Sequence, residues 1–286
     1  MSSISLTASM RSNLLSLQQT ASLMNQTQER LSSGKKVNSA VDNPSAFYTA
    51  QSLTNRANDL SGLLDNMGQA VSTIKAANEG IEAITNFVEQ AKAVATSALD
   101  TTDTTSRASY MAQFNAIRGQ IDALAADSGY KGINLLKGGS LSVVFNEGRT
   151  NKLDITGVDA TTASGGLNIR EGADWGKVAD AVAGPTAAEI TAQNTKIKDA
   201  IDDATKAIDK LREYASAFGN NYSIVQTRED FTTNLINVLE EGADKLTLAD
   251  MNEESANMLA LQTRQQLAIN SLSLASQASQ SVLKLF

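Results

Sequence analysis

The sequence predicts a mainly α protein: an elongated antiparallel coiled-coil helical bundle, built from the N- and C-terminal segments, with a small insert that contains a β-hairpin. Apolar residues recur in steps of three and four through five segments, which is the spacing of coiled-coil packing. Proline occurs only twice and aromatic residues make up 5% of the chain, which favours thin helical layers over a thick globular core. Glycines gather in one central stretch, at about 129–186, where the helical period stops.

The five heptad segments lie at about 10–31, 53–88, 110–124, 190–239 and 258–286. The fourth segment covers about 50 residues, so as a helix it would be roughly 75 Å long at about 1.5 Å per residue. One short apolar stripe is usually the core face of an ordinary helix. Five such stripes in one chain, two of them long, favour an elongated bundle instead.

Local signals place the ends of these helices. Asn43 before Pro44 predicts a helix start, with Asn43 as the cap and Pro44 at the first position. Residues 100–106 are a run of Asp, Thr and Ser that predicts a polar turn between two helices. Residues 250–253 resemble a capping box that opens the last helix. In the insert, two short strand-like runs at 141–145 and 152–156 flank a turn and predict the β-hairpin.

Composition excludes several kinds of chemistry. The chain of 286 residues has no histidine and no cysteine, which excludes a Ser-His-Asp triad, a Cys-His pair and a zinc site of imidazole or thiolate ligands. A net charge of −7 without a dense Lys/Arg cluster argues against a nucleic-acid partner. No apolar run is long enough for membrane insertion, and the N-terminus lacks the features of a cleaved signal peptide. We therefore predict no enzyme, no catalytic residue, no cofactor and no metal.

The two ends of the chain are unusually poor in charge. Residues 1–28 contain one charged side chain, Arg11, and residues 260–286 contain two. The last heptad segment also carries a second apolar stripe, through Leu267, Leu274 and Leu285. Two stripes on one helix indicate burial on more than one side.

From this pattern we expect both ends to be buried against copies of the same chain, which gives a helical filament when the contacts do not close. The alternative is that the ends pack onto their own bundle. The residues predicted to carry self-assembly are Met10, Leu14, Leu17, Met24, Leu31, Met258, Leu261, Leu267, Leu272, Leu274, Val282 and Leu285.

Four stretches carry a resemblance to a known family. Arg30-Leu-Ser-Ser-Gly-Lys-Lys-Val-Asn-Ser-Ala-Val-Asp42 is similar to the N-terminal signature of bacterial flagellins, and residues 14–19 resemble the helix before it. Residues 131–136 resemble the short motif that precedes the family's hairpin. Residues 262–277 resemble the C-terminal assembly helix, notably of the α-proteobacterial branch. The resemblance covers about 1–136 and 186–286, so the chain resembles a short flagellin.

The resemblance implies a structural subunit that polymerises into the extracellular flagellar filament for swimming motility. It implies that residues 1–42 pair with 247–286 as an inner coiled coil, while 43–246 form the outer tube wall with the insert at about 129–186. It also implies export of the unfolded chain by the flagellar type III apparatus, without a cleaved signal peptide. The implied partners are further copies of the chain, an export chaperone, the flagellar cap protein and the hook–filament junction protein.

One segment departs from the family's pattern. In the family, an animal Toll-like receptor senses an Arg-Val-Arg-Glu-Leu core, and the corresponding residues here are Gln90, Lys92, Ala93 and Val94, with alanine between the first two. A lost guanidinium fork and a lost carboxylate predict poor receptor activation. A reporter assay that shows potency equal to an enteric flagellin would contradict this.

We also hypothesise that the hairpin, at about 140–157, adjusts the switch between filament states.

Two other functions remain as alternatives. The chain could be a hook–filament junction protein, because residues 42–44 are similar to that protein's Asp-Asp-Pro, although the match in the last helix favours flagellin. It could also be a surface polysaccharide-binding flagellin homologue. The single tryptophan, Trp175, and the small insert argue against a groove for stacked sugars.

Overall fold

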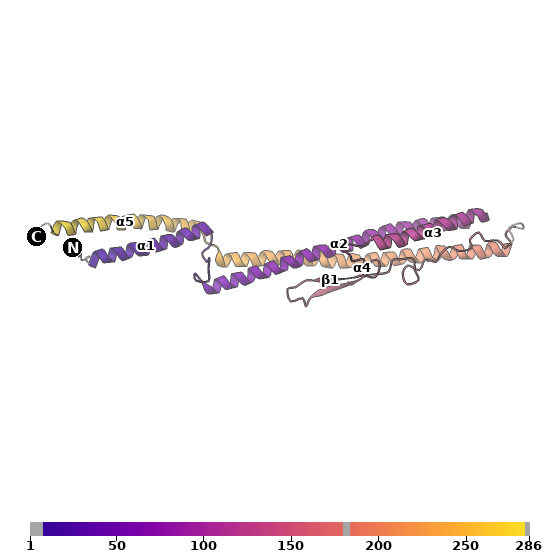
Figure 1. Cartoon of the computed structure of the whole chain (residues 1–286), viewed down its shortest axis with the longest axis horizontal. Helices are drawn as coiled ribbons and strands as arrows, with labels where there is room; N and C mark the ends of the chain where they lie inside the picture. The colour runs from indigo at the N-terminus through magenta and orange to yellow at the C-terminus, as the bar shows by residue number, and fades with distance from the viewer. Residues whose placement is uncertain (1–7, 180–183, 284–286) are drawn as a thin grey trace. The chain divides into compact units, whose positions relative to one another are not determined.

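The chain is described by a computed structural model that covers residues 8–179 and 184–283 (Figure 1). The elements in chain order are α1 (Ala8–Ser33), α2 (Pro44–Asp100), α3 (Thr104–Asp127), β1 (Ser140–Val144), β2 (Lys152–Thr156), α4 (Ala187–Thr247) and α5 (Met251–Leu283). The predicted class, mainly α with a hairpin in a central insert, is confirmed. The fourth heptad segment is part of a single helix of 61 residues, longer than the pattern alone indicated.

The predicted helix starts are confirmed at atomic detail. Pro44 opens α2, and the Asn43 side-chain oxygen accepts a hydrogen bond from the Ala46 backbone N–H at 3.1 Å. Asp103 caps α3 by accepting from the Ser106 N–H at 2.7 Å. Asp250 caps α5 by accepting from the backbone N–H groups of the second and third helical residues, at 2.9 and 3.3 Å. Each cap satisfies donors that a helix N-terminus leaves without a partner.

The chain divides into two compact units. The central unit is residues 59–236, and the terminal unit combines the residues before 59 with those after 236. The division falls inside the long helices α2 and α4, so each unit contains a part of both. Each unit has its own buried residues, and the large apolar core belongs to the central unit.

Strict heptads build the central core. In α2, α3 and α4 the buried side chains repeat every seven residues, and none of those that follow is more than 3% exposed. They are Met67, Ile74, Ile81, Val88 and Ala95 in α2, Phe114 and Ile121 in α3, and Ile197, Ala204, Leu211, Phe218 and Val225 in α4. Coiled-coil packing of the three helices follows directly from this spacing, as the sequence predicted.

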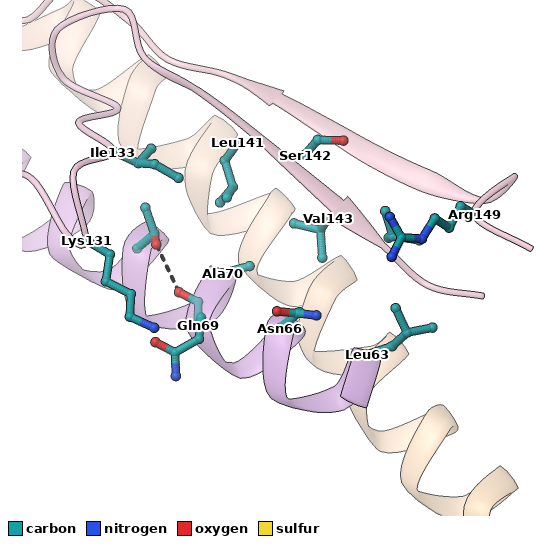
Figure 2. Close-up of a pocket in the computed structure, with 12 residues that line it drawn as sticks. Leu63, Asn66, Gln69, Ala70, Lys131, Ile133, Leu141, Ser142, Val143 and Arg149 are labelled. Atoms are coloured by element: carbon teal, nitrogen blue, oxygen red, sulfur yellow. Dashed lines mark hydrogen bonds between the residues drawn. The ribbon is translucent and has the colours of Figure 1, made fainter. Parts of the chain in front are cut away.

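The hairpin packs one face on the helical core. Its strands are antiparallel, with Leu141 opposite Ile155 and Val143 opposite Leu153. Val143 and Ile155 are buried, whereas Ser142 faces solvent and donates to the Asp154 carboxylate at 2.6 Å. A groove of about 400 Å³ remains between β1 and α2, and Figure 2 shows Leu141 and Val143 pointing across it toward Ala70.

The rest of the insert follows an irregular path held by polar side chains of the helices. Asn115 of α3 both donates to the Gly172 carbonyl and accepts from its N–H, at 2.9 and 2.8 Å. Further bonds to the insert backbone come from Arg118 to Ile169, from Lys210 to Gly166 and from the Thr162 N–H to Asp122. These bonds give backbone groups of the insert the partners that a sheet ladder would otherwise supply.

Candidate self-assembly surface

The terminal helices α1 and α5 form a pair within the terminal unit. They lie side by side and run antiparallel, so that the first turn of α1 and the last turn of α5 are at the same end of the pair (Figure 1). On the inner face of α5, Met258, Leu261 and Leu272 are at least partly buried. On α1, Leu17 and Met24 are partly buried as well. The pair therefore has an apolar line of contact on one face of each helix.

This contact is thin. Among the side chains of α1 and α5 that the structure describes, only Thr20, Thr27, Glu254 and Leu261 are buried. Three of these four are polar. The Thr20 hydroxyl bonds its own helix, donating to the Ser16 carbonyl at 2.8 Å. A pair with so little apolar core gains little free energy from burial alone.

Many large apolar side chains of the pair point to solvent instead. We call the following exposed set the terminal apolar surface: Leu14 (38% exposed), Leu15 (57%), Leu23 (47%), Leu259 (67%), Leu267 (62%), Ile269 (51%) and Leu274 (67%). Single exposed leucines are ordinary on protein surfaces, but a set this dense marks an interaction site.

The electrostatics of the same helices favour contact with another apolar surface. Between residues 8 and 28 the only charged side chain is that of Arg11, and between 255 and 283 it is that of Arg264. Depletion of charge together with exposed leucine is the composition of the centre of a protein–protein interface. The arrangement can bury apolar area against a partner without desolvating charges.

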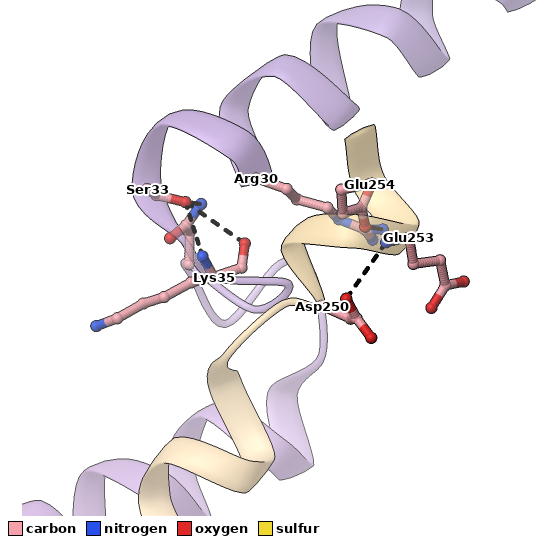
Figure 3. A network of polar contacts seen from close by, with 7 residues as sticks. Arg30, Ser33, Lys35, Asp250, Glu253 and Glu254 are labelled. Atoms are coloured by element: carbon pink, nitrogen blue, oxygen red, sulfur yellow. Dashed lines mark hydrogen bonds and ion pairs between the residues drawn. The ribbon is translucent and has the colours of Figure 1, made fainter. Parts of the chain in front are cut away.

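A polar network joins the C-terminal end of α1 to the N-terminal end of α5 (Figure 3). The Arg30 guanidinium donates to the Glu254 carboxylate at 2.8 Å. The chain then turns at Gly34, whose φ of 71° lies in the left-handed region that glycine adopts most readily. The Gly34 carbonyl accepts from the Ala249 N–H at 3.0 Å. These contacts fix the register in which the two helices meet.

A second turn next to this network is held by Asp42. Its carboxylate accepts from the backbone N–H groups of Ser39 and Asn38, both at 3.0 Å. These backbone hydrogen bonds, with that of Ser39 first, hold the pKa of Asp42 below its ordinary value. The carboxylate thus remains charged and closes the connection between α1 and α2.

The structure places the predicted assembly residues on two faces. Met10, Leu17, Met24, Leu31, Met258, Leu261 and Leu272 lie on partly or fully buried positions, whereas Leu14, Leu267 and Leu274 are exposed. The stripe that the sequence assigned to α1 is therefore shifted: Thr20 and Thr27 occupy buried positions, and Leu14 lies outside. Leu285 and the side chain of Val282 fall outside the described residues.

Four exposed residues of the terminal apolar surface were not predicted from the sequence. Leu15, Leu23, Leu259 and Ile269 do not fall on either stripe that the sequence showed. A usable signal was present, because leucine or isoleucine off the heptad positions of a charge-poor helix has no intramolecular reason to be there.

The predicted receptor segment lies on α2 in the central unit. Gln90 and Ala93 are exposed, and Lys92 and Val94 are partly buried. The two substituted positions expected to weaken receptor contact most are thus on the surface. Poor receptor activation stays a prediction.

Within residues 8–179 and 184–283, no group of three or more Asp or Glu side chains is arranged to hold a metal ion. Of the helices described, none is long and apolar enough to cross a membrane.

Comparison with known proteins places both ends of the chain in one family. Residues 4–140 match the bacterial flagellin N-terminal helical region, and residues 188–286 match the bacterial flagellin C-terminal helical region. The two matched regions include the whole of α1, α2, α3, α4 after its first residue, and α5.

Individual relatives match over nearly their whole length. Flagellin FljO of Caulobacter vibrioides is 29% identical over 274 residues, which cover 96% of this chain and 94% of the relative. A flagellin of Brucella melitensis is 29% identical over 293 residues, covering 100% and 99%. Among solved structures, the crystal structure of Bacillus cereus flagellin matches 58% of this chain and 88% of its own, at 14% identity and a TM-score of 0.44.

Proposed function

Because the chain belongs to the bacterial flagellin family and is a structural subunit of the flagellar filament rather than an enzyme, we propose that α1 and α5 carry the contacts that hold it in that filament. The observation that carries this proposal is the terminal apolar surface: seven exposed Leu and Ile side chains on two helices with almost no charge.

Burial of this surface would supply a substantial part of the free energy of assembly. Full burial of a leucine or isoleucine stabilises by about 1.5–3 kcal/mol, so burying the exposed half of each contributes roughly 1 kcal/mol. The seven together would contribute about 7 kcal/mol per subunit before the costs of association. The filament repeats the contact along its length, which adds to the stability of each subunit within it.

The geometry of the two helices supports an open polymer. The exposed leucines lie on faces that differ from the α1–α5 contact, so one subunit can meet neighbours on more than one side. Contacts between different surfaces of identical chains continue without end when the rotation does not close. Residues 1–42 and 247–286 would line the inside of the tube, with 43–246 as its wall.

The filament is an extracellular structure, and we propose that the chain reaches it unfolded, through the flagellar type III apparatus and without a cleaved signal peptide. The absence of cysteine supports this route, because no thiol can mispair on the way. The exposed α5 leucines would be shielded before export by a chaperone. The cap protein would guide folding at the tip, and the hook–filament junction protein would hold the first subunits.

We also propose that the hairpin tunes the switch between filament states. The groove of about 400 Å³ beneath β1 leaves one side of that strand without close packing on α2. A shift of the hairpin across this groove would change the shape of the subunit at small cost. Deletion of residues 140–157 without a change in filament waveform would contradict the proposal.

The test of assembly uses electron microscopy of the purified full chain with and without sheared filament seeds. The double variant Leu267→Gln, Leu274→Gln removes two exposed leucines, and the chain lacking residues 260–286 removes most of α5. The matched control is Gln266→Ala, Ser273→Ala, which alters two exposed polar residues of the same helix. Circular dichroism of each monomer verifies that the helices remain.

We expect long uniform tubes from the full chain and the control, and none from the two other variants. Tubes from the leucine variant at the wild-type critical concentration would place the assembly contacts elsewhere. Monomers or short rings from the seeded full chain would contradict the filament contacts proposed for α1 and α5.

A further inference from the structure

The groove between β1 and α2 lies within the central unit and has a floor, a wall and two ends (Figure 2). The floor is one face of α2, which includes Leu63 and Ala70, and the wall is the run of residues 141–144 in β1. Ile133 adds apolar surface from the insert. Its volume of about 400 Å³ is in the range of ligand-binding clefts. Among the described residues, those that line it include none of β2, so the groove follows one edge of the hairpin.

The hydrogen bonds of the hairpin leave open backbone groups along this wall. The sheet has two strands, so β1 has a neighbour on one side only. The Phe145 N–H donates to the Asn151 carbonyl at 2.9 Å, which sets the alternation along the strand. In an antiparallel pair, residues that bond across the ladder alternate with residues whose N–H and C=O point away from it. Ser142 and Val144 therefore direct their backbone groups to the free edge, where the groove lies.

The free edge of β1 also lacks the features that commonly prevent a further strand from pairing. Residues 140–144 contain no charged side chain and no proline. β2, in contrast, carries Lys152 and Asp154, which form an ion pair at 2.8 Å. Charged side chains, proline and bulges are the usual protection of an edge strand. Of the two edges of the hairpin, that of β1 is the one left open.

Two cations stand at the ends of the groove. Lys131 lies beside Gln69 at one end, and Arg149 lies at the other end, in the hairpin turn (Figure 2). Both are exposed, and within the part of the chain that the structure describes neither forms an ion pair. The described lining residues include no Asp or Glu, although the net charge of the chain is −7. This arrangement attracts negative charge to both ends of an apolar groove.

Both cations also have backbone conformations that are unusual for their residue types. The φ angle is 49° at Lys131 and 54° at Arg149. Glycine adopts this left-handed region readily, whereas a side chain makes it unfavourable. Residues in such conformations cluster at functional sites. A turn alone would favour glycine or asparagine at both positions, so two long cations there support a binding role.

We propose that this groove binds an extended peptide of another protein, which pairs with β1 as a third strand and carries an acidic residue near each end. Main-chain hydrogen bonds to the edge supply affinity, alternate side chains rest on α2, and the two carboxylates meet Lys131 and Arg149. α2 rises about 15 Å from Leu63 to Thr73, which is the length of about five residues in a strand. The two acidic residues should therefore be about six positions apart.

The chemistry of the wall favours a peptide over the other occupants. An amphiphile would cover the backbone groups of Ser142 and Val144 without bonding them, which costs free energy. A second copy of the chain has no suitable strand among its described residues, because β1 has no acidic side chain and β2 has one. A peptide with an acidic residue near each end satisfies the edge, the floor and both cations.

The first test titrates dye-labelled peptides with the monomeric full-length chain and measures fluorescence anisotropy. The probe is capped Glu-Val-Thr-Val-Thr-Val-Glu, and its matched control has lysine in place of both glutamates. Two further acidic probes carry N-methyl groups on alternate backbone amides, one set for each edge of the peptide. Light scattering verifies that the chain remains monomeric.

We expect the acidic probe to bind at least about tenfold more tightly than the lysine probe at low salt, with a smaller difference at high salt. One N-methylated probe should bind like its parent and the other about tenfold more weakly, because only one edge of the peptide can face β1. Equal binding of the two N-methylated probes, or no binding of the acidic probe, would overturn the third strand. A bound fraction that falls as the chain approaches its assembly concentration would assign the groove to a second copy, and would also overturn the proposal.

The second test replaces the two cations. Lys131→Gly and Arg149→Gly place glycine at left-handed positions, so the free energy of unfolding in urea should stay the same or rise. Each should weaken binding of the acidic probe by about threefold at low salt, and the double variant by about tenfold. The control Lys198→Ala removes an exposed cation of α4 outside the groove and should leave binding unchanged. Unchanged affinity in the double variant would overturn the acidic partner. The assembly function of α1 and α5 is tested separately, since these measurements use the monomer.

Discussion

Arg107 offers the sharpest test of what stabilises the central unit. Its side chain is fully buried, and all three of its recorded acceptors are neutral. The guanidinium donates to the Thr101 carbonyl at 2.6 Å, to the Gln193 side-chain oxygen at 2.8 Å and to the Asn194 side-chain oxygen at 2.6 Å. Burial lowers the pKa of Arg107 from its ordinary value, because the charged form loses hydration. One side chain thus joins the α2–α3 turn to α4.

Arg107→Met keeps the length of the side chain and removes every donor. A hydrogen bond from a charged donor contributes about 1.5–3 kcal/mol, but two of the acceptors are less buried than Gln193 and can bond water in the variant. The free energy of unfolding should fall by about 3 kcal/mol. At a slope of about 2 kcal/mol per molar urea, the midpoint should fall by about 1.5 M.

Trp175 is the reporter for this measurement. It is the single tryptophan, it is 1% exposed, and its ring centre lies 5.0 Å from that of Phe114 in α3. Its fluorescence therefore follows unfolding at the same end of the central unit. A double-mutant cycle with Gln193→Leu should give a coupling of about 1–2 kcal/mol, since leucine no longer needs a donor. An unchanged urea midpoint, or strictly additive variants, would refute the stabilising role of these bonds.

Three further predictions use the same urea assay. Asp203→Asn should lower the free energy of unfolding by about 1–3 kcal/mol, because the buried carboxylate accepts hydrogen bonds from two nitrogens of Arg170 at 2.6 and 3.2 Å. The control is Asp202→Asn at the adjacent exposed position, which should change the free energy of unfolding little. Gly157→Ala should lower the free energy of unfolding by more than about 2 kcal/mol, since a Cβ there would overlap the Gly139 carbonyl oxygen. The control is Gly148→Ala in the turn, where a Cβ has room, and it should leave the free energy of unfolding nearly unchanged. Hydrogen bonds from the Ser106 side chain and backbone hold the pKa of Asp103 below its ordinary value, so its contribution is present above the unfolded pKa and is lost as pH falls through the folded one. The free energy of unfolding should therefore be constant from neutral pH down to about 5 and fall below about pH 4. Asp103→Ala should weaken this acid dependence. A variant that keeps the full wild-type dependence would contradict the role given to Asp103.

Periodicity and caps were sufficient to predict most of the helical architecture. The heptads of α2 and α4 have no competing pattern, and Asn43 and Asp250 each mark a boundary by a side chain that bonds the first helical turn. Between α2 and α3 the sequence predicted only a polar turn, and the structure identifies Asp103 as the cap. The hairpin was predicted for the same kind of reason, because two alternating runs flank a turn. Local chemistry decides these features, so a single sequence contains them.

The sequence failed where one side chain serves a distant backbone. Asn115, Arg118 and Lys210 each bond a carbonyl of the insert that lies more than 40 positions away. No spacing rule connects such pairs, and a buried Arg107 looks like any solvated arginine in the sequence. In α1 the sequence placed Leu14 in the contact and missed Thr20 and Thr27, because an exposed leucine and buried threonines reverse the usual correspondence between hydrophobicity and burial.

That reversal explains how the monomer and the polymer share one sequence. The central unit buries its heptads almost completely, so folding of the single chain already satisfies them. The terminal pair buries mainly threonine and glutamate and leaves seven leucine and isoleucine side chains in water. If these side chains faced each other within the pair, the monomer would be more stable and assembly would gain nothing from them. The free energy that an assembled filament gains must come from surface that the monomer leaves exposed, and the terminal helices hold the largest share of that surface.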